Sequence, residues 1–155
     1  MSVTEALTAV TDPEIPSASI VDLGMVHAVT ESADAVEVEL LPTFVGCPAK
    51  YVIGQDVERA VSGAAPGKRV SVRFVYDPPW TADRVNERGR AALRGFGISP
   101  DAGTCPYCGS RETDLESAFG PTPCRSTHFC RSCRNVYEGF KDKGRRVLPI
   151  VGEAS

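Results

Sequence analysis

Alternating hydrophobic and polar positions predict three strands in the first part of the chain. "MVHAVTE" and "VEVELLPT" alternate on either side of "SADA", which predicts a β-hairpin. "RVSVRFVY" alternates in the same way and predicts a third strand. Between them the spacing becomes helical, and the predicted helix begins with Pro48 and ends at Gly63. Its expected apolar face consists of Val52, Ile53, Val57, Ala60 and Val61.

Two further helices flank these elements. Thr4 followed by "EALTAV" predicts a short helix, and "DPEIP" ends it because residues that precede proline avoid the helical conformation. Thr81 is expected to cap a second helix, "ADRVNERGRAALRGF", which Gly97 closes. The order helix, strand, strand, helix, strand, helix predicts an α+β domain with a small three-stranded sheet over residues 1–98.

The chain changes character after "GISPDAGT", whose Gly, Pro and Ser content is typical of a linker. From residue 105 onward the hydrophobic periodicity weakens, and five of the six cysteines lie between 105 and 133. A unit this small buries too little apolar surface to fold alone. We therefore predict a metal-stapled unit over residues 105–141, followed by a loosely ordered tail over 142–155.

Two Cys-x-x-Cys motifs, "CPYC" and "CRSC", predict a metal site in this unit. Such a spacing lets one tight turn aim two thiolates at one ion, and the second motif completes a tetrahedron. The expected cofactor is a structural zinc ion held by Cys105, Cys108, Cys130 and Cys133. Redox cysteines are less consistent with a matched pair of motifs, since a redox motif follows a strand of a βαβ unit.

Other assignments for these thiols stay open. The same four thiolates could hold an iron-sulfur cluster. A site of three cysteines and one histidine could instead use Cys124 or His128, which lie between the two motifs. Otherwise Cys124 is a small buried hydrophobic residue and His128 a surface or packing residue.

Composition and charge narrow the classes of partner. The first residues lack a basic region followed by an apolar run, and no stretch approaches eighteen apolar residues, so we expect a cytoplasmic protein with no membrane partner. In the cytosol thiols stay reduced, which favours metal ligands over disulfides. The net charge is −3, and the mildly basic ribbon lacks the concentrated basic footprint of a nucleic-acid-binding protein. The charge distribution fits a protein partner.

Three further residues carry candidate chemistry. Cys47 falls at the predicted N-cap of a helix, where the dipole and unpaired N–H groups lower the pKa of a thiol. Its thiolate could be a nucleophile, a soft metal ligand or a redox sensor, and the alternative is an inert buried cysteine. Asp12 and Glu14 could point the same way along an extended segment toward a metal or a basic partner, or could simply form a turn.

The motifs combine into a resemblance to a known family. "DPEIPSASIVDLGMV", "PTFVGCPA" and "YDPPWTADRVNERGRAALRGFGI" resemble the small domain shared by bacterial and eukaryotic cytosolic iron-sulfur assembly factors. The segment from "CPYCGS" to "YEGFK" is similar to the C-terminal extension of one branch, the PaaD family of phenylacetate degradation. The resemblance runs from Leu7 to Lys141. It departs at Asp142, where many relatives continue with a cysteine.

This resemblance implies a function and a set of site residues. Members of the branch are accessory to the multicomponent phenylacetyl-CoA epoxidase and help to install or maintain its iron-sulfur or iron centres. In the wider family the cysteine that matches Cys47 is reactive, and Asp12, Glu14 and Thr43 match the other typical polar positions. A scheme that needs a sulfur at position 142 does not apply to this chain.

Two functions follow as hypotheses. In the first, the chain is a non-enzymatic maturation factor: Cys47 binds iron or a cluster transiently, with a homodimer supplying a second thiolate, and the ribbon docks the client. Its partners would be reductase or oxygenase components of the epoxidase, or the iron-sulfur assembly machinery. In the second, the chain is a structural subunit of the oxygenase complex that mediates contacts through its zinc ribbon. A nucleic-acid-binding ribbon is a third reading, resting only on the mildly basic segment.

Overall fold

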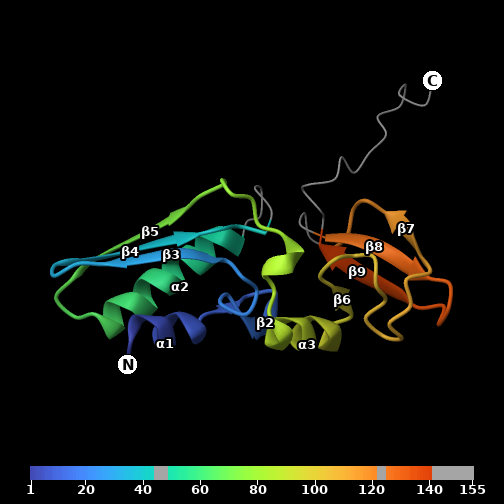
Figure 1. The fold of residues 1–155 in the computed structure, drawn as a ribbon, viewed down its shortest axis with the longest axis horizontal. Coiled ribbons are helices and arrows are strands. Elements are labelled where there is room, and N and C mark those ends of the chain that lie inside the picture. Colours follow the sequence, from blue (N-terminus) through green and yellow to red (C-terminus); the bar gives the residue numbers. More distant parts are fainter. Residues whose placement is uncertain (44–48, 122–124, 141–155) are drawn as a thin grey trace, which may run out of the picture.

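The computed structural model describes residues 1–43, 49–121 and 125–140. Figure 1 shows two units placed end to end, a helix-covered sheet at the N-terminal end and a second sheet at the other. The helices are α1 (Val3–Thr8), α2 (Ala49–Ala64), the 3-10 helix η1 (Ala82–Arg84) and α3 (Glu87–Gly95). The strands are β1 (Thr11–Asp12), β2 (Ile15–Ser19), β3 (Val26–Glu31), β4 (Ala35–Leu40), β5 (Arg69–Phe74), β6 (Ile98–Ser99), β7 (Thr113–Ser117), β8 (Arg125–Cys130) and β9 (Val136–Phe140).

The first unit contains the predicted three-stranded sheet, in the order β3-β4-β5. β3 and β4 form the antiparallel hairpin, and β5 runs parallel to β4. A parallel neighbour needs a crossover connection, and the chain makes this crossover through α2. α1 and α2 cover one face of the sheet (Figure 1). Val36, Val38 and Leu40 of β4 are fully buried beneath them, and burying each such side chain contributes about 1.5–3 kcal/mol.

The helix packing differs from the predicted pattern at two places. α2 buries Ala49, Ile53, Val57 and Val61, while Val52 is 45% exposed and does not belong to the apolar face. α1 begins earlier than predicted, because its N-cap is Ser2 rather than Thr4. The Ser2 hydroxyl accepts from the Glu5 N–H at 3.1 Å, and the Glu5 carboxylate accepts from the Ser2 N–H at 2.8 Å. This capping box satisfies two backbone donors at once.

The single helix predicted from Thr81 is two separate elements. Thr81 precedes η1, but its side chain makes no capping hydrogen bond. The chain then becomes extended at Val85, and α3 begins with Asn86 as its N-cap, which accepts from the Gly89 N–H at 2.8 Å. The predicted end is confirmed, since Gly97 follows α3 with φ of +70°.

A short hairpin of β1 and β2 replaces the simple helix stop expected at "DPEIP". Asp12 pairs with Ile15 across a turn, and the Asp12 carboxylate accepts from the Glu14 N–H at 2.8 Å. The turn chemistry considered for Asp12 is therefore realised. It holds Glu14 at the turn, between the two strands.

The second unit is a four-stranded sheet in the order β6-β9-β8-β7. β7, β8 and β9 form an antiparallel meander, and β6 adds to β9 in parallel. β6 lies in the segment expected to be a linker, and both of its residues are buried. The α+β fold class with an additional four-cysteine ribbon is confirmed.

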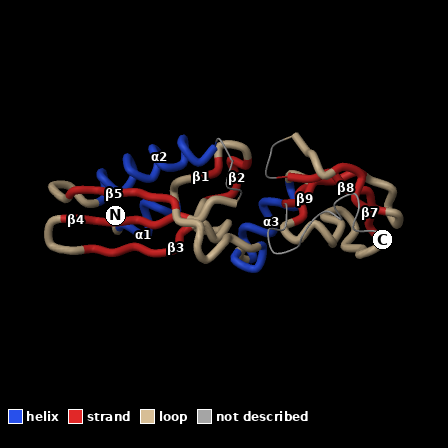
Figure 2. The backbone as a smooth tube through the Cα atoms, turned by 90° about the horizontal axis from the view of Figure 1, so that it is seen from above, coloured by secondary structure: helices blue, strands red, loops and turns tan. Residues whose placement is uncertain are grey.

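An aromatic contact joins the two units. Trp80, which precedes η1, is 3% exposed, and its ring lies edge-on to Phe140 of β9 with centroids 5.3 Å apart. Its indole N–H donates to the Leu23 carbonyl at 2.7 Å. Figure 2 shows the junction from above, with β3, β4 and β5 at one end of the molecule and β7, β8 and β9 at the other. Across the described ranges, no helix has the length and apolar character to cross a membrane.

Candidate metal centre

The structure brings four of the predicted ligands together. The Sγ atoms of Cys105, Cys108, Cys130 and Cys133 all lie within 4.8 Å of one another. Cys105 and Cys133 are 3.6 Å apart at sulfur, and so are Cys108 and Cys130. Four thiolates at about 2.3 Å from a tetrahedral zinc ion stand about 3.8 Å apart, whereas a disulfide needs about 2.05 Å. The group therefore has the dimensions of a four-thiolate site for one metal ion.

Two similar turns build this site. In the first, the Gly109 N–H donates to the Cys105 carbonyl at 2.9 Å, and in the second the Arg134 N–H donates to the Cys130 carbonyl at 2.8 Å. Both turn residues have positive φ, +80° and +63°. The Ser110 and Ser132 hydroxyls lie 2.8 Å apart and link the turns. Each turn thus presents two sulfurs to the same point.

Backbone donors favour the thiolate form at the second turn. The Cys133 N–H points to Sγ of Cys130 at 3.5 Å, and this hydrogen bond is the main cause that lowers the pKa of Cys130 to about 6. The Asn135 backbone N–H is the main cause that lowers the pKa of Cys133, and the Asn135 side chain adds a second donor at 3.4 Å. Since metals bind thiolates, these donors prepare the site for an ion.

In the first turn, the surroundings of Cys108 favour the protonated thiol. The Ser110 backbone N–H lowers the pKa of Cys108, but desolvation and hydrogen bonds with the other three thiols together raise it to about 12. Closely spaced thiols cannot all ionise without a cation between them, so binding of a metal must displace a proton from this group.

His128 lies outside the group of sulfurs. Its Nε2 is 2.7 Å from the Ser126 hydroxyl, and its ring stacks on Tyr137 with centroids 5.3 Å apart. Burial lowers the pKa of His128, so the ring is neutral at physiological pH. The Tyr137 hydroxyl donates to the Ala102 carbonyl at 2.7 Å. His128 is thus half-buried in the ribbon's own packing, while Cys124 lies outside the described residues.

Of the polar residues that the resemblance singled out, Glu14 contacts the second unit, while Asp12 and Thr43 are buried in the first. Glu14 accepts from Arg125 of β8 at 3.1 Å, and a second nitrogen of Arg125 lies 3.0 Å from the Glu138 carboxylate. The Arg125 side chain is only 9% exposed. This ion pair links the "DPEIP" turn to the strand whose other end is Cys130. Sequence reasoning missed Arg125, and its only signal was one charged residue at the start of a strand.

Asp12 has an environment unlike that of Glu14. It is 7% exposed, and desolvation by this burial raises its pKa, although the Glu14 backbone N–H and the Arg125 charge act in the opposite direction. Thr43 is also buried, at 5% exposure. Cys47 lies outside the described residues, between Thr43 and the start of α2. The structure therefore does not place Cys47 relative to the metal centre.

Known families match both units of the chain. Residues 2–74 match the family described as iron-sulfur cluster assembly protein. Residues 97–141 match the PaaD zinc beta ribbon domain. The second match begins at Gly97, immediately before β6, in agreement with the pairing of β6 and β9.

Solved structures resemble the first unit. A domain of unknown function, DUF59, from Bacillus anthracis superimposes with a TM-score of 0.55 at 32% identity, covering 59% of this chain and 87% of that one. A conserved hypothetical protein from Thermotoga maritima superimposes with a TM-score of 0.52 at 30% identity, covering 62% and 91%. Both comparisons support the α+β fold of this unit.

Curated relatives extend the match to most of the chain. The "Fe-S protein maturation auxiliary factor YitW" of Bacillus subtilis (strain 168) is 34% identical and covers 57% of this chain and 86% of its own. A protein of Escherichia coli (strain K12) that is named as a 1,2-phenylacetyl-CoA epoxidase subunit is 39% identical over 148 residues, covering 87% of this chain and 88% of its own. With both units, their order and the four ribbon cysteines in place, the chain belongs to the PaaD family, in which an iron-sulfur assembly domain precedes a zinc ribbon.

Proposed function

We propose that this protein is a maturation factor that helps to supply iron or an iron-sulfur cluster to a phenylacetyl-CoA epoxidase, without catalysing a reaction of its own. The observation that carries the proposal is the joining of an iron-sulfur assembly domain to a four-cysteine ribbon through buried contacts. The names of the relatives support an accessory role: three are called maturation auxiliary factors and one is called an epoxidase subunit.

The ribbon ion is proposed to be a structural zinc held by Cys105, Cys108, Cys130 and Cys133. Support comes from the separation of the sulfurs, since all four can reach one ion. In a four-cysteine iron-sulfur cluster the thiolates are divided among two or four iron atoms, so the four sulfurs as a group spread farther apart. Zinc has no redox chemistry of its own, and its binding energy would fold a unit whose core consists of little more than Cys105, Cys130 and Tyr137.

Cys47 is proposed to be the thiol that carries the cargo. One thiolate cannot hold a cluster alone, so a second copy of the chain would supply the second ligand. In transfer, a thiolate of the client would form a new bond to iron, and the bond to the Cys47 sulfur would break with the electron pair remaining on that sulfur. No electrons change hands, and a weak anchor is easier to displace than the four ligands of the ribbon.

The test is the content of zinc, iron and acid-labile sulfide per chain after anaerobic purification. We would compare the intact protein with Cys47→Ser, and use Cys124→Ser as the matched control that removes a different thiol. One zinc in all three, with iron and sulfide lost only from Cys47→Ser, supports the carrier role. Iron and sulfide that survive loss of Cys47 would mean that the ribbon itself holds the cluster. Cys130→Ser is expected to lose the zinc and the ribbon fold.

Activity gives an independent readout. The epoxidase components would be produced with the intact protein, with Cys47→Ser or with neither, and the iron content and turnover of the epoxidase measured. A Cys47→Ser protein that matures the epoxidase normally would refute the carrier role. Zinc alone in every variant, with normal maturation, would favour the second candidate below.

The second candidate is a standing subunit of the oxygenase complex, and the name of the Escherichia coli relative favours it. In this role the ribbon would mediate contacts between subunits and no cargo would move. Co-purification of the chain with the oxygenase in a fixed stoichiometric ratio would support this candidate. A chain that is absent from the purified active complex would exclude it.

A further inference from the structure

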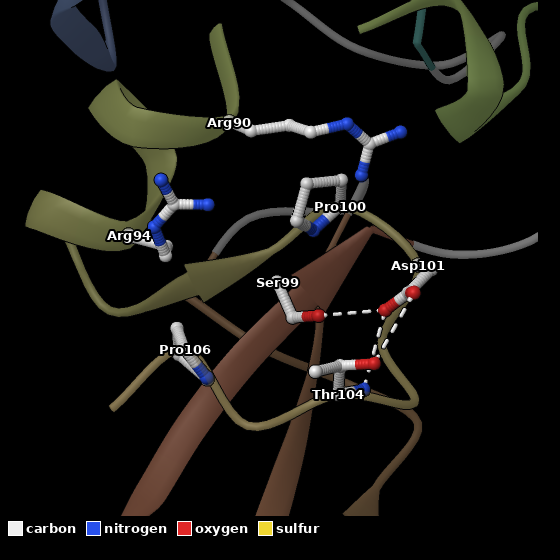
Figure 3. Close-up of a pocket in the computed structure, with 7 residues that line it drawn as sticks. All are labelled: Arg90, Arg94, Ser99, Pro100, Asp101, Thr104 and Pro106. Carbon is white, nitrogen blue, oxygen red and sulfur yellow. Dashed lines mark hydrogen bonds between the residues drawn. The ribbon is translucent and has the colours of Figure 1, made fainter. Parts of the chain in front are cut away.

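A small hollow lies between α3 and the loop that leads into the first metal-binding turn. Its volume is about 190 Å³, and its lining residues are Arg90, Arg94, Ser99, Pro100, Asp101, Thr104 and Pro106. Figure 3 shows Arg90 and Arg94 on the helix side and the loop of Ser99, Asp101 and Thr104 on the other. Pockets for whole small-molecule ligands measure about 300–1,000 Å³, so this hollow fits a single side chain better than a cofactor.

Across the hollow from the two arginines lies Asp101, whose carboxylate accepts hydrogen bonds from its own loop. Asp101 accepts from the Ser99 hydroxyl at 2.8 Å, from the Gly103 and Thr104 N–H groups at 3.1 and 3.2 Å, and from the Thr104 hydroxyl at 3.4 Å. These bonds fix the loop (Figure 3). Within the described ranges, neither Arg90 nor Arg94 forms an ion pair. The hollow therefore holds two arginines and one carboxylate, Asp101, whose hydrogen bonds go to its own loop, so one positive charge is left over.

The stability of α3 explains the presence of Arg94 but not the presence of a second arginine, Arg90, one turn away. Arg94 is in the last turn of α3, where a cation interacts favourably with the helix dipole. Arg90 donates to the Ala82 carbonyl at 3.3 Å, which uses one of its five N–H groups. The two residues are one turn apart, and like charges at this spacing repel each other. A second cation on the same wall is a cost to the free protein that an acidic partner would remove.

Two exposed aromatic residues are near neighbours in the sequence of the lining residues Arg94 and Pro106. Phe96 follows α3 and is 49% exposed, and Tyr107 is 56% exposed with its hydroxyl against Gly97. Arginine and aromatic residues around a small pocket are the composition of protein interfaces. Tyr107 and Pro106 lie between Cys105 and Cys108, so the first metal-binding turn forms one side of this surface.

We propose that this surface, formed by Arg90, Arg94, Phe96, Pro100, Pro106 and Tyr107, binds an acidic segment of a client protein. A glutamate or aspartate of the segment enters the hollow and receives hydrogen bonds from the guanidinium groups, and an adjacent apolar residue contacts Phe96 and Tyr107. The proposal deepens the docking role given to the ribbon and rests on the proposed function for the identity of the client. It also makes docking depend on the ribbon's metal ion, which fixes Tyr107.

The test is an NMR titration of the ¹⁵N-labelled, zinc-loaded full chain. The probe is a capped six-residue peptide with three glutamates and one leucine, and its counterpart carries lysines in place of the glutamates. We expect saturable shifts of the backbone signals of Phe96 and Tyr107 and of the guanidinium signals of Arg90 and Arg94 with the acidic peptide alone. Shifts spread over the whole surface, or equal shifts with the lysine peptide, would overturn the proposal.

Variants separate a built surface from general electrostatic attraction. Arg90→Gln with Arg94→Gln should weaken binding of the acidic peptide by about tenfold or more, since charge-assisted hydrogen bonds are lost. Arg59→Ala with Arg69→Ala removes an equal number of positive charges, from α2 and β5, and should leave affinity unchanged within about twofold. Equal losses in both double variants contradict the proposal. Arg90→Glu with Arg94→Glu should reverse the preference toward the lysine peptide, which a fold defect could not produce.

Two further measurements fix the kind of ligand and the role of the metal. Inorganic phosphate that produces the same shifts at the same concentration as the peptide would mean a free-anion site rather than a docking surface. Removal of the metal under reducing conditions should abolish peptide binding, and binding that survives would exclude the first turn from the surface. Failure of peptide binding, with Cys47→Ser still blocking maturation, would reject this inference and leave the proposed function standing.

Discussion

At the scale of single residues, Asp12 combines a structural hydrogen bond with an unfavourable charge. Its carboxylate accepts from the Glu14 N–H, and burial raises its pKa above the ordinary 3.8. A carboxyl group with a raised folded-state pKa contributes stability that is fully present below pH 3.8 and is lost as the pH rises through the folded-state pKa. At neutral pH the folded protein therefore carries the cost of an ionised, buried group.

Replacing Asp12 by asparagine should raise the free energy of unfolding at neutral pH. Asn keeps an oxygen that can accept from the Glu14 N–H, and it carries no charge to desolvate. The gain over the natural protein should shrink as the pH falls toward 3.8, because the natural carboxyl becomes neutral there. Urea unfolding at a series of pH values measures the difference.

The control for this prediction is Asp12→Ala, which removes both the charge and the acceptor. It should be less stable than Asp12→Asn at every pH by about 1 kcal/mol, since a hydrogen bond of the turn is lost. An Asn variant that is less stable than the natural protein at pH 7 would show that ionised Asp12 interacts favourably, through Arg125, by more than its burial costs.

Sequence spacing predicted that the four ribbon cysteines come together, but it did not predict the contacts at the junction of the two units. The four cysteines could be found because two Cys-x-x-Cys turns impose their own geometry within a few residues. Arg125 could not be found, because its partner Glu14 is 111 positions away in the chain and local patterns carry no signal over that distance. The roles of Cys47 and Thr43 stay predictions, as they rest on the resemblance.

At the scale of elements, the two metal-binding turns differ in the residue that follows the second cysteine. Gly109 has φ of +80° and Arg134 has φ of +63°. Glycine adopts positive φ without steric cost, whereas a side chain there costs about 1–2 kcal/mol. The second turn therefore stores strain that the first turn avoids.

This difference predicts opposite effects of two substitutions. Arg134→Gly should relieve the strain and slow the loss of metal to a chelator, although the greater freedom of glycine in the unfolded chain offsets part of the gain. Gly109→Ala should add strain, about 1 kcal/mol, and speed metal loss by about fivefold; no atom lies within 4 Å of the added Cβ, so a clash is not involved. Stopped-flow chelation of the zinc-loaded protein measures both rates. Identical rates in the two variants would show that metal loss does not pass through opening of these turns.

Element prediction succeeded for the three strands that alternate clearly, and it missed β2, β7, β8 and β9 although each has five or six residues. β3, β4 and β5 each have six residues, enough for several alternations, and all three were predicted. β1 and β6 have two residues each, which is too short for any period, and their existence depends on partners elsewhere in the chain. The break between η1 and α3 was missed because helical spacing continues across Val85 while its backbone is extended.

At the scale of the whole molecule, one arginine links the two units. Arg125 lies between the carboxylates of Glu14 and Glu138 and is almost fully buried. Removing the cation leaves two carboxylates close together without a partner, and breaking a buried ion pair in this way costs about 3–5 kcal/mol. Arg125→Met should therefore destabilise the contact between the units strongly, with hydrogen exchange rising in β2 and β9 together.

Glu14→Gln should destabilise the contact between the units less than Arg125→Met does. It keeps an oxygen that can accept from Arg125, and Glu138 still neutralises the guanidinium. The expected loss is about 1 kcal/mol, with exchange confined to the "DPEIP" turn. Equal effects of Glu14→Gln and Arg125→Met would mean that Glu138 contributes nothing to holding the arginine.

The packing of Trp80 against Phe140 provides the molecule with an optical reporter. Trp80 is the chain's one tryptophan, and its indole lies in the junction beside the last residue of β9. Excitation of tryptophan therefore reads a single position, and water reaching that position moves the emission to longer wavelength. Stripping the ribbon's metal should produce this red shift, and restoring zinc should reverse it. The state of the ribbon can thus be followed in real time in unlabelled protein.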